Sequence, residues 1–251
     1  MPKPPKKLFA QRIAERMQAL GVSKVDDLVP MLLDDNEKTW KALNILVTQA
    51  QLRHAPDLIA FLYRTEDITQ IHDAGEAIIK LQQRQVNLLQ PLIDYMLNFN
   101  FGSQQRETVA HSLTHEYPKL PRTWHERLSR AFCTVLVDMT EVPNLRGQAA
   151  EGLAELYDCY FVGQYGRTRQ YRRAGGLLIR MLCDPTPEVR FWSCFALGMM
   201  RYRPALPALN ALANKDLANH SNWWSVGEEA SDAIDWIKGR TPPERVARGV
   251  L

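Results

Sequence analysis

The feature that most constrains the fold is a five-residue pattern that returns six times: a small residue, two of any kind, a small or aliphatic residue, then Leu or Ile. The first residues of successive copies lie 32, 35, 40, 44 and 37 positions apart. Such intervals are typical of repeats built from two helices. Small residues let neighbouring helices approach closely, and the Leu or Ile fills the groove between them. The copies are Ala42-Ile45-Leu46, Ala74-Ala77-Ile78, Val109-Ser112-Leu113, Ala149-Gly152-Leu153, Ser193-Ala196-Leu197 and Ala230-Ala233-Ile234.

Apolar residues recur at three- and four-residue spacing along most of the chain, which predicts helices that bury one face. A single helix pair cannot bury that face alone, so the pairs must stack on one another. We therefore predict an all-α fold, a right-handed α-solenoid of about six to seven helix pairs in one domain over 8–251, with 1–7 a mobile basic tail. Second helices are expected at Asp57–Tyr63, Leu88–Leu97, Trp124–Val137, Tyr171–Leu182 and Ala205–Ala213, and a capping pair at about Leu8–Leu20 and Val25–Leu33.

One segment, from Asp184 to Lys215, carries a recognisable motif. It reads Asp184, Pro187-x-Val189-Arg190, Ala196-Leu197-Gly198 and Pro204-Ala205-Leu206-Pro207-Ala208-Leu209. This segment resembles the HEAT repeat, in particular the subtype named after phycobilisome lyases. The segment Asn144–Leu153 matches in part, and the rest of the chain is assigned on spacing alone. The resemblance implies that Asp184 and Arg190 belong to a structural ladder between repeats. It also implies that the second helices line a concave, partner-binding face.

Positive charge is concentrated in one part of the chain. The net charge is only +3, yet 160–203 holds eight arginines and two acidic residues. The turns at 116–122 and 159–170 are longer than the turn at 201–204, and equivalent turns of stacked repeats fall on one edge. Arginine binds carboxylates and phosphates through two parallel hydrogen bonds and stacks on aromatic rings, and the aromatic residues Tyr160, Phe161, Tyr165 and Tyr171 are interspersed here. A solvated basic loop is the alternative interpretation.

Trp223 and Trp224 lie in a polar segment before the last expected helix. They either cap the core of the terminal repeat or anchor a partner, since exposed tryptophans are frequent binding hot spots. The residues predicted to bind a partner are Tyr165, Arg167, Arg169, Tyr171, Arg172, Arg173, Arg201, Arg203, Trp223 and Trp224.

Three enzyme classes are the alternatives to a binding module, and each has a partial resemblance to this sequence. His111 and His115, with His125 nearby, resemble the His-Glu pairs of HEAT-repeat deoxyhypusine hydroxylases, but that family repeats its pairs in four repeats and this chain holds them in one. A bilin lyase lacks a chromophore motif here. Asp184, Arg190 and Trp192 resemble the site of a HEAT-like DNA glycosylase but fit the repeat pattern better. We therefore expect no catalytic activity, no metal and no cofactor.

The four cysteines lack the paired spacing of a zinc site and suggest reduced thiols in a cytoplasmic protein. No apolar stretch reaches 18 residues, so no membrane span is expected. The sequence predicts a non-catalytic binding module, an adaptor or an immunity-like inhibitor. It would recognise a macromolecular partner, an acidic protein in the first place, through its concave face and its basic, aromatic edge. Nucleic acid is the alternative partner, and the oligomeric state is left open.

Overall fold

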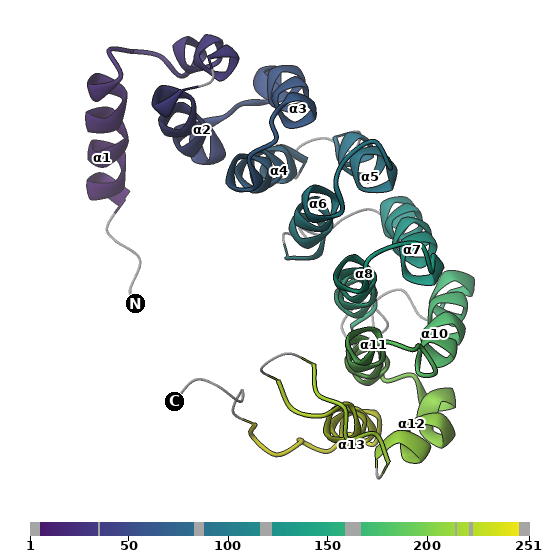
Figure 1. Cartoon of the computed structure of the whole chain (residues 1–251). Helices are drawn as coiled ribbons and strands as arrows, with labels where there is room; N and C mark the ends of the chain where they lie inside the picture. Colours follow the sequence, from purple (N-terminus) through teal and green to yellow (C-terminus); the bar gives the residue numbers. More distant parts are fainter. Residues whose placement is uncertain are drawn as a thin grey trace. The chain divides into compact units, whose positions relative to one another are not determined.

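The computed structural model describes residues 6–34, 36–82, 88–115, 122–158, 167–213, 215–220 and 223–245. Over these residues the chain is helical and contains no strand, apart from one isolated antiparallel bridge between Asn219 and Ser225. The predicted all-α solenoid fold is confirmed. None of the described helices is long and apolar enough to cross a membrane. The α-helices are α1 (Lys6–Ala19), α2 (Glu37–Gln49), α3 (Ala55–Arg64), α4 (Ile68–Gln82), α5 (Leu89–Leu97), α6 (Ser103–His115), α7 (Arg122–Val137), α8 (Pro143–Leu156), α10 (Arg169–Met181), α11 (Pro187–Met199), α12 (Leu206–Ala213) and α13 (Val226–Ile237) (Figure 1).

The chain divides into two compact units. Unit 1 comprises residues 1–95 and 116–119, and unit 2 comprises 96–115 and 120–251. A single domain over 8–251 preceded by a mobile tail stays a prediction, and residues 1–5 of that tail lie outside the described part of the chain.

In unit 1, α4 packs against both α2 and α3. The expected helix at Val25–Leu33 is instead two short 3₁₀ helices, Val25–Leu28 and Pro30–Leu33. Pro30 explains the difference, because proline has no amide hydrogen to donate and its ring clashes with the preceding turn of an α-helix. The first copy of the sequence pattern lies on α2, and its three residues, Ala42, Ile45 and Leu46, are fully buried.

In unit 2 the first helices of the repeats form one closely packed row, α6, α8, α11 and α13, in that order. The second helices cover it from the other side: α7 packs on α8, α10 on α11 and α12 on α13. Figure 1 shows the row of first helices on the inner side of the bend within unit 2. This corrects the expectation that the second helices line the inner face. The small residues that permit close packing are on the first helices, so these helices approach one another most closely.

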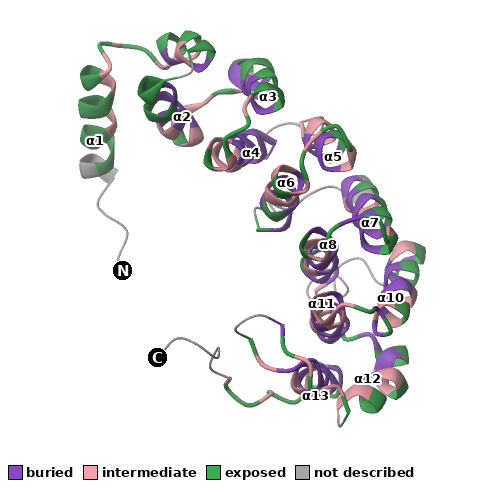
Figure 2. Cartoon of the chain, viewed as in Figure 1, coloured by how far each residue is buried: buried purple, intermediate pink, exposed green. Residues whose placement is uncertain are grey.

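The six copies of the sequence pattern are all buried, and Figure 2 shows the buried sides of α6, α8 and α11 turned toward neighbouring helices. Two glycines show how tight the seam is. A Cβ atom at Gly152 would lie 2.6 Å from the ring of Phe132, and one at Gly198 would lie 2.7 Å from the ring of Trp236. These positions need glycine because a large aromatic side chain occupies the space that a methyl group would fill.

A ladder of ion pairs, two of them buried and the third partly buried, joins successive repeats of unit 2. In each rung, an arginine from the first helix of one repeat binds a carboxylate that lies before the first helix of the next repeat. The spacing of the arginines, 40 and 44 residues, follows the repeat spacing. The rungs are Arg106–Glu141, Arg146–Asp184 and Arg190–Asp216.

The middle rung shows how the buried charged groups of the ladder find hydrogen-bond partners. The Arg146 guanidinium donates through Nε to the carbonyl oxygen of Leu136 at 3.1 Å and through Nη2 to Asp184. Burial alone would raise the pKa of Asp184, but hydrogen bonds from Thr186 and Arg146 hold that pKa below its ordinary value. The carbonyl oxygen of Asp184 accepts a further hydrogen bond, at 2.8 Å, from Nη1 of Arg190. The expectation that Asp184 and Arg190 are scaffold residues is therefore confirmed.

Breaking this rung should be costly. Changing Arg146→Met leaves the Asp184 carboxylate buried without its countercharge, which should lower the free energy of unfolding by about 3–5 kcal/mol. The double change Arg146→Met with Asp184→Asn removes both charges and should restore at least half of that loss. Urea unfolding of the three proteins measures both quantities. A single variant within 1 kcal/mol of wild type, taking about 1 kcal/mol as the scale of an ordinary hydrogen bond, would contradict the structural role.

Candidate functional site

Six exposed arginines gather at one end of α10 and at the adjacent turn; we call them the arginine edge. Arg167, Arg169, Arg172 and Arg173 lie at the start of α10 and are all exposed. The turn before α12 contributes the exposed Arg201 and Arg203.

Tyr202 brings the two groups of arginines together. Its hydroxyl donates to the carbonyl oxygen of Arg172 at 3.3 Å, and its ring packs against Gly175, where a Cβ atom would lie 2.5 Å away. Arg201 and Arg203 flank this buried tyrosine and are thereby held beside the beginning of α10. Tyr202 thus places the turn that carries Arg201 and Arg203 next to α10.

The tyrosines expected on this edge do not all lie there. Tyr171 is 1% exposed, and its hydroxyl donates to the carbonyl oxygen of Met200 at 3.0 Å. Its ring packs edge-on against Tyr157 and Tyr202 in the core. Tyr171 is therefore a core residue and not a surface contact, because it faces the neighbouring repeats. Tyr165, like Tyr160 and Phe161, lies outside the described residues, as does most of the enlarged turns at 116–122 and 159–170.

The arginine edge is electrostatically unbalanced. Within the described residues none of its six guanidinium groups pairs with a carboxylate; Arg172 donates to the carbonyl oxygen of Arg167 at 3.3 Å. The first turn of α10 contains no acidic residue, although a helix N-terminus carries partial positive charge and favours anions. Clustered cations at that end are unfavourable by themselves and favour the binding of negatively charged groups.

A second feature of unit 2 is a hollow of about 300 Å³ lined by aromatic rings; we call it the tryptophan pocket. Its rings form a chain of contacts, with centroids 5.2 Å apart for Trp223 and Trp224, 6.3 Å for Trp192 and Trp223, and 5.7 Å for Phe195 and Trp236. The lining residues are Glu151, Phe191, Trp192, Phe195, Trp223, Trp224, Glu229, Asp232, Trp236, Pro242, Pro243 and Arg245.

The two tryptophans singled out from the sequence have different places in this pocket. Trp223 is 39% exposed, whereas Trp224 is half-buried and donates through Nε1 to Oε2 of Glu229 at 2.7 Å. Trp223 is thus the rim of the pocket and Trp224 part of its wall.

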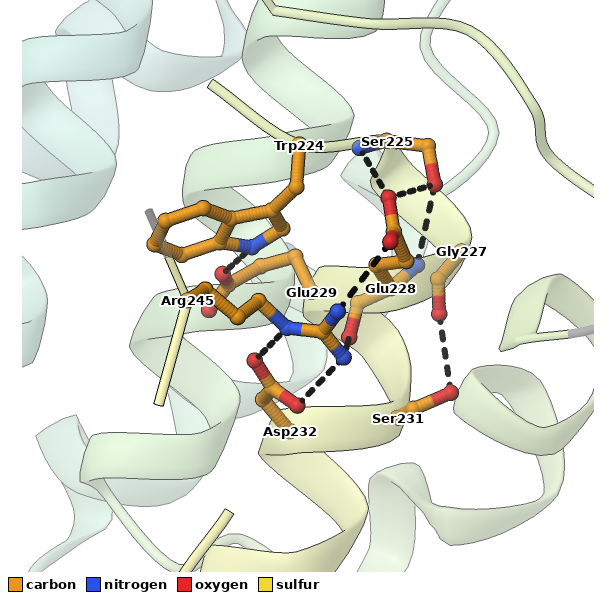
Figure 3. A network of polar contacts seen from close by, with 8 residues as sticks. All are labelled: Trp224, Ser225, Gly227, Glu228, Glu229, Ser231, Asp232 and Arg245. Atoms are coloured by element: carbon orange, nitrogen blue, oxygen red, sulfur yellow. Dashed lines mark hydrogen bonds and ion pairs between the residues drawn. The ribbon is translucent and has the colours of Figure 1, made fainter. Parts of the chain in front are cut away.

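A polar network lies beneath the aromatic wall (Figure 3). Arg245, from the segment after α13, donates from Nη2 to Asp232 at 2.8 Å and from Nη1 to Glu228 at 3.1 Å. Its guanidinium carbon lies 5.9 Å from the centre of the Trp224 ring. A cation of this chain therefore already sits between carboxylates and an indole ring.

Glu229 is the unusual member of this network. Its Oε1 atom is buried and, within the described residues, has no hydrogen-bond partner. Burial, together with the nearby charge of Asp232, raises the pKa of Glu229 to about 8, even though Trp224 and Arg245 oppose the rise. At neutral pH the group is mostly protonated, so the pocket contains less negative charge than its carboxyl groups suggest.

The tryptophan pocket is not predicted from the sequence as a unit. A signal was present: four of the six tryptophans fall between 192 and 236. The carboxyl groups of Glu151, Glu229 and Asp232 could not be assigned to it from spacing, because they come from two helices whose relative rotation is set by packing.

The histidines considered as metal ligands do not form a cluster with a third ligand among the described residues. The rings of His111 and His115 stack with centroids 4.2 Å apart, and Nε2 of His115 lies 3.6 Å from Glu151. His125 lies on α7. The described residues that could surround an ion are His72, Asp73 and Glu76, all on α4.

Replacing the buried acid should change the pH dependence of stability. The pKa of Glu229 is higher in the folded protein, about 8, than its ordinary value of 4.5, so unfolding releases a proton between these values. Wild-type stability should therefore fall as pH rises, by about 3 kcal/mol from pH 5 to pH 8 through this group. Glu229→Gln, which has the shape of the protonated acid, should lose this slope. Urea unfolding at both pH values tests it; parallel slopes in the two proteins would refute it.

Comparisons with known proteins agree with the repeat architecture. The HEAT repeat family model matches residues 176–200, which overlaps the segment that carries the sequence motif. No curated protein matches the chain. Among solved structures, an engineered protein is similar with a TM-score of 0.54 at 17% identity, covering 89% of this chain and 100% of its own. A second engineered protein has a TM-score of 0.53 at 16% identity, over 91% and 61%. Human deoxyhypusine hydroxylase has a TM-score of 0.42 at 14% identity, over 85% and 84%. The likeness to the two engineered proteins shows the fold alone.

Proposed function

We propose that the protein is a non-catalytic binding module that recognises an acidic protein partner through the arginine edge, together with the inner row of first helices in unit 2. The observation that supports this most directly is the set of six exposed arginines with no carboxylate partner among the described residues. HEAT repeats commonly mediate protein interactions, which agrees with this role.

The cost of the arginine edge to the folded protein strengthens the proposal. Like charges at the start of a helix repel one another and oppose the helix dipole, so four arginines in seven residues weaken the fold. Other arginines of unit 2, among them Arg106 and Arg146, are buried and paired with carboxylates. Unpaired arginines on the surface therefore fit a role in binding better than a role in folding.

A protein partner is favoured over nucleic acid because the positive charge is local. The chain as a whole is only +3, whereas nucleic-acid binders usually present an extended basic surface that follows the phosphate backbone. Within this proposal, the protein acts as an adaptor or as an immunity-like inhibitor. We also propose that it is located in the cytoplasm. The phycobilisome-lyase subtype stays a prediction.

Replacing four arginines of the arginine edge should weaken partner binding without lowering the stability of the fold. Changing Arg167, Arg169, Arg172 and Arg173 together to Gln should weaken partner capture more than tenfold, because each charge-assisted hydrogen bond contributes about 1.5–3 kcal/mol. The melting temperature should stay equal or rise, since like charges are removed. Affinity capture from native cells, with quantification of recovered proteins, measures the first effect, and calorimetry measures the second.

A matched control carries the same number of Gln substitutions at exposed cations of unit 1: Arg12, Arg16, Lys24 and Lys38. It should retain the partner. Capture that disappears after nuclease treatment, with a steep loss of binding as salt increases, would replace the protein partner by nucleic acid. A fall in melting temperature with the first variant alone would show that those arginines are scaffold residues.

A further inference from the structure

The tryptophan pocket differs in chemistry from the arginine edge, because aromatic rings and carboxyl groups line it. Among the described residues that line it, the only cation is Arg245, which Asp232 and Glu228 already hold. We propose that the tryptophan pocket binds a methylated ammonium group, the chemistry shared by choline and by a trimethylated lysine side chain. The proposal is independent of the partner of the arginine edge and concerns different residues.

The aromatic lining is the first argument. The faces of tryptophan rings attract cations, and several rings around one cavity form the cage that quaternary ammonium ligands use. Here Trp192, Trp223 and Trp236 are each partly exposed rather than fully packed, so their rings remain available to the hollow. Its volume of about 300 Å³ accommodates a branched, methyl-rich head group. Methyl groups also gain from contact with the two prolines, Pro242 and Pro243, which close one side.

Charge is the second argument, and it selects a cation over a neutral apolar ligand. Glu151 contributes a carboxylate from α8 with 15% of its side chain exposed, and its only ion pair among the described residues is the 3.6 Å contact with His115. Glu229 contributes a buried carboxyl group whose Oε1 has no partner among the described residues. Both lie at the pocket. A positive charge placed within it would stabilise the Glu151 carboxylate and would favour the ionised form of Glu229, which is otherwise mostly protonated at neutral pH.

Arg245 provides the third argument, because it shows the same chemistry in use. Its guanidinium lies over the Trp224 ring and is fixed by two carboxylates (Figure 3). A guanidinium is planar and satisfies the carboxylates by directed hydrogen bonds. The remaining hollow is lined mainly by aromatic rings, which suit a cation that cannot donate hydrogen bonds. The two cations would thus occupy adjacent and different sites.

The experiment compares choline with 3,3-dimethyl-1-butanol, a neutral molecule of the same shape, by saturation-transfer NMR on the intact chain. Choline should bind about tenfold more tightly, since cation–π attraction distinguishes the two. Equal binding of both would show a merely apolar groove, and no binding of choline would also overturn the proposal.

Variants locate the site. Trp223→Ala and Glu151→Gln should each weaken choline binding severalfold, whereas Trp40→Ala, which removes a tryptophan 47% exposed in unit 1, should not. Circular dichroism confirms that each variant is folded. Choline binding that survives both pocket changes would place the site elsewhere and refute the assignment. A peptide with trimethyllysine that binds more tightly than free choline would identify a protein-borne group, and the reverse would identify a small molecule.

The pH dependence gives a second readout. A cation in the pocket favours the ionised form of Glu229, so affinity should rise between pH 7 and pH 9. Of the other groups near Glu229, Asp232 is paired with Arg245, and burial raises the pKa of Cys194 well above its ordinary value. The variant Glu229→Gln should show a flat profile. A flat wild-type profile would refute the role of Glu229 in the site.

Discussion

Unit 2 depends on the pairing of a buried arginine in one repeat with a carboxylate of the next. A guanidinium removed from water is costly unless its donors all meet acceptors in good geometry. Here the acceptors are at fixed places: carbonyl groups that end the preceding helix, and acidic residues before the following helix. Each rung therefore fixes both the distance between repeats and their rotation. Because α11 and α13 are oriented in this way, the rings of Trp192 and Trp236 come to face the same hollow.

The two surfaces described in unit 2 have opposite chemistry and arise from the same architecture. Turns between helices are exposed, so charge gathers there at little cost to packing, and the arginine edge lies at such turns. The tryptophan pocket forms at the end of the layer of second helices that covers the row of first helices. The row of first helices is covered by α7, α10 and α12, whereas α13 is followed, over 238–245, by an extended segment. Aromatic rings that another helix would cover are left partly open.

The sequence predicted most of the architecture, because the small-residue pattern directly records helix packing. All six copies are buried, and five expected second helices are found within a few residues. It failed where the outcome depends on three-dimensional context. Pro30 divides a segment whose apolar spacing resembled a helix. Tyr171 looked like part of an exposed cluster, yet its ring is buried between those of Tyr157 and Tyr202. The inner row was assigned to the wrong helices, since one-dimensional spacing does not show which layer packs more tightly.

Asp184 belongs to two rungs at once: its carboxylate holds Arg146 and its carbonyl oxygen holds Arg190. Asp184 thus joins the repeat of α8 to that of α11, and Arg190 extends the connection to the following repeat through Asp216. In an array whose neighbours interact only through apolar contact, an end repeat can fray while the remainder stays folded. Because Asp184 accepts from both Arg146 and Arg190, opening the contact between two repeats also disturbs the next contact along the array. This sharing opposes the unfolding of one repeat at a time. Amide hydrogens in α8 and α11 would then exchange with solvent through a common, cooperative opening of this segment and not helix by helix.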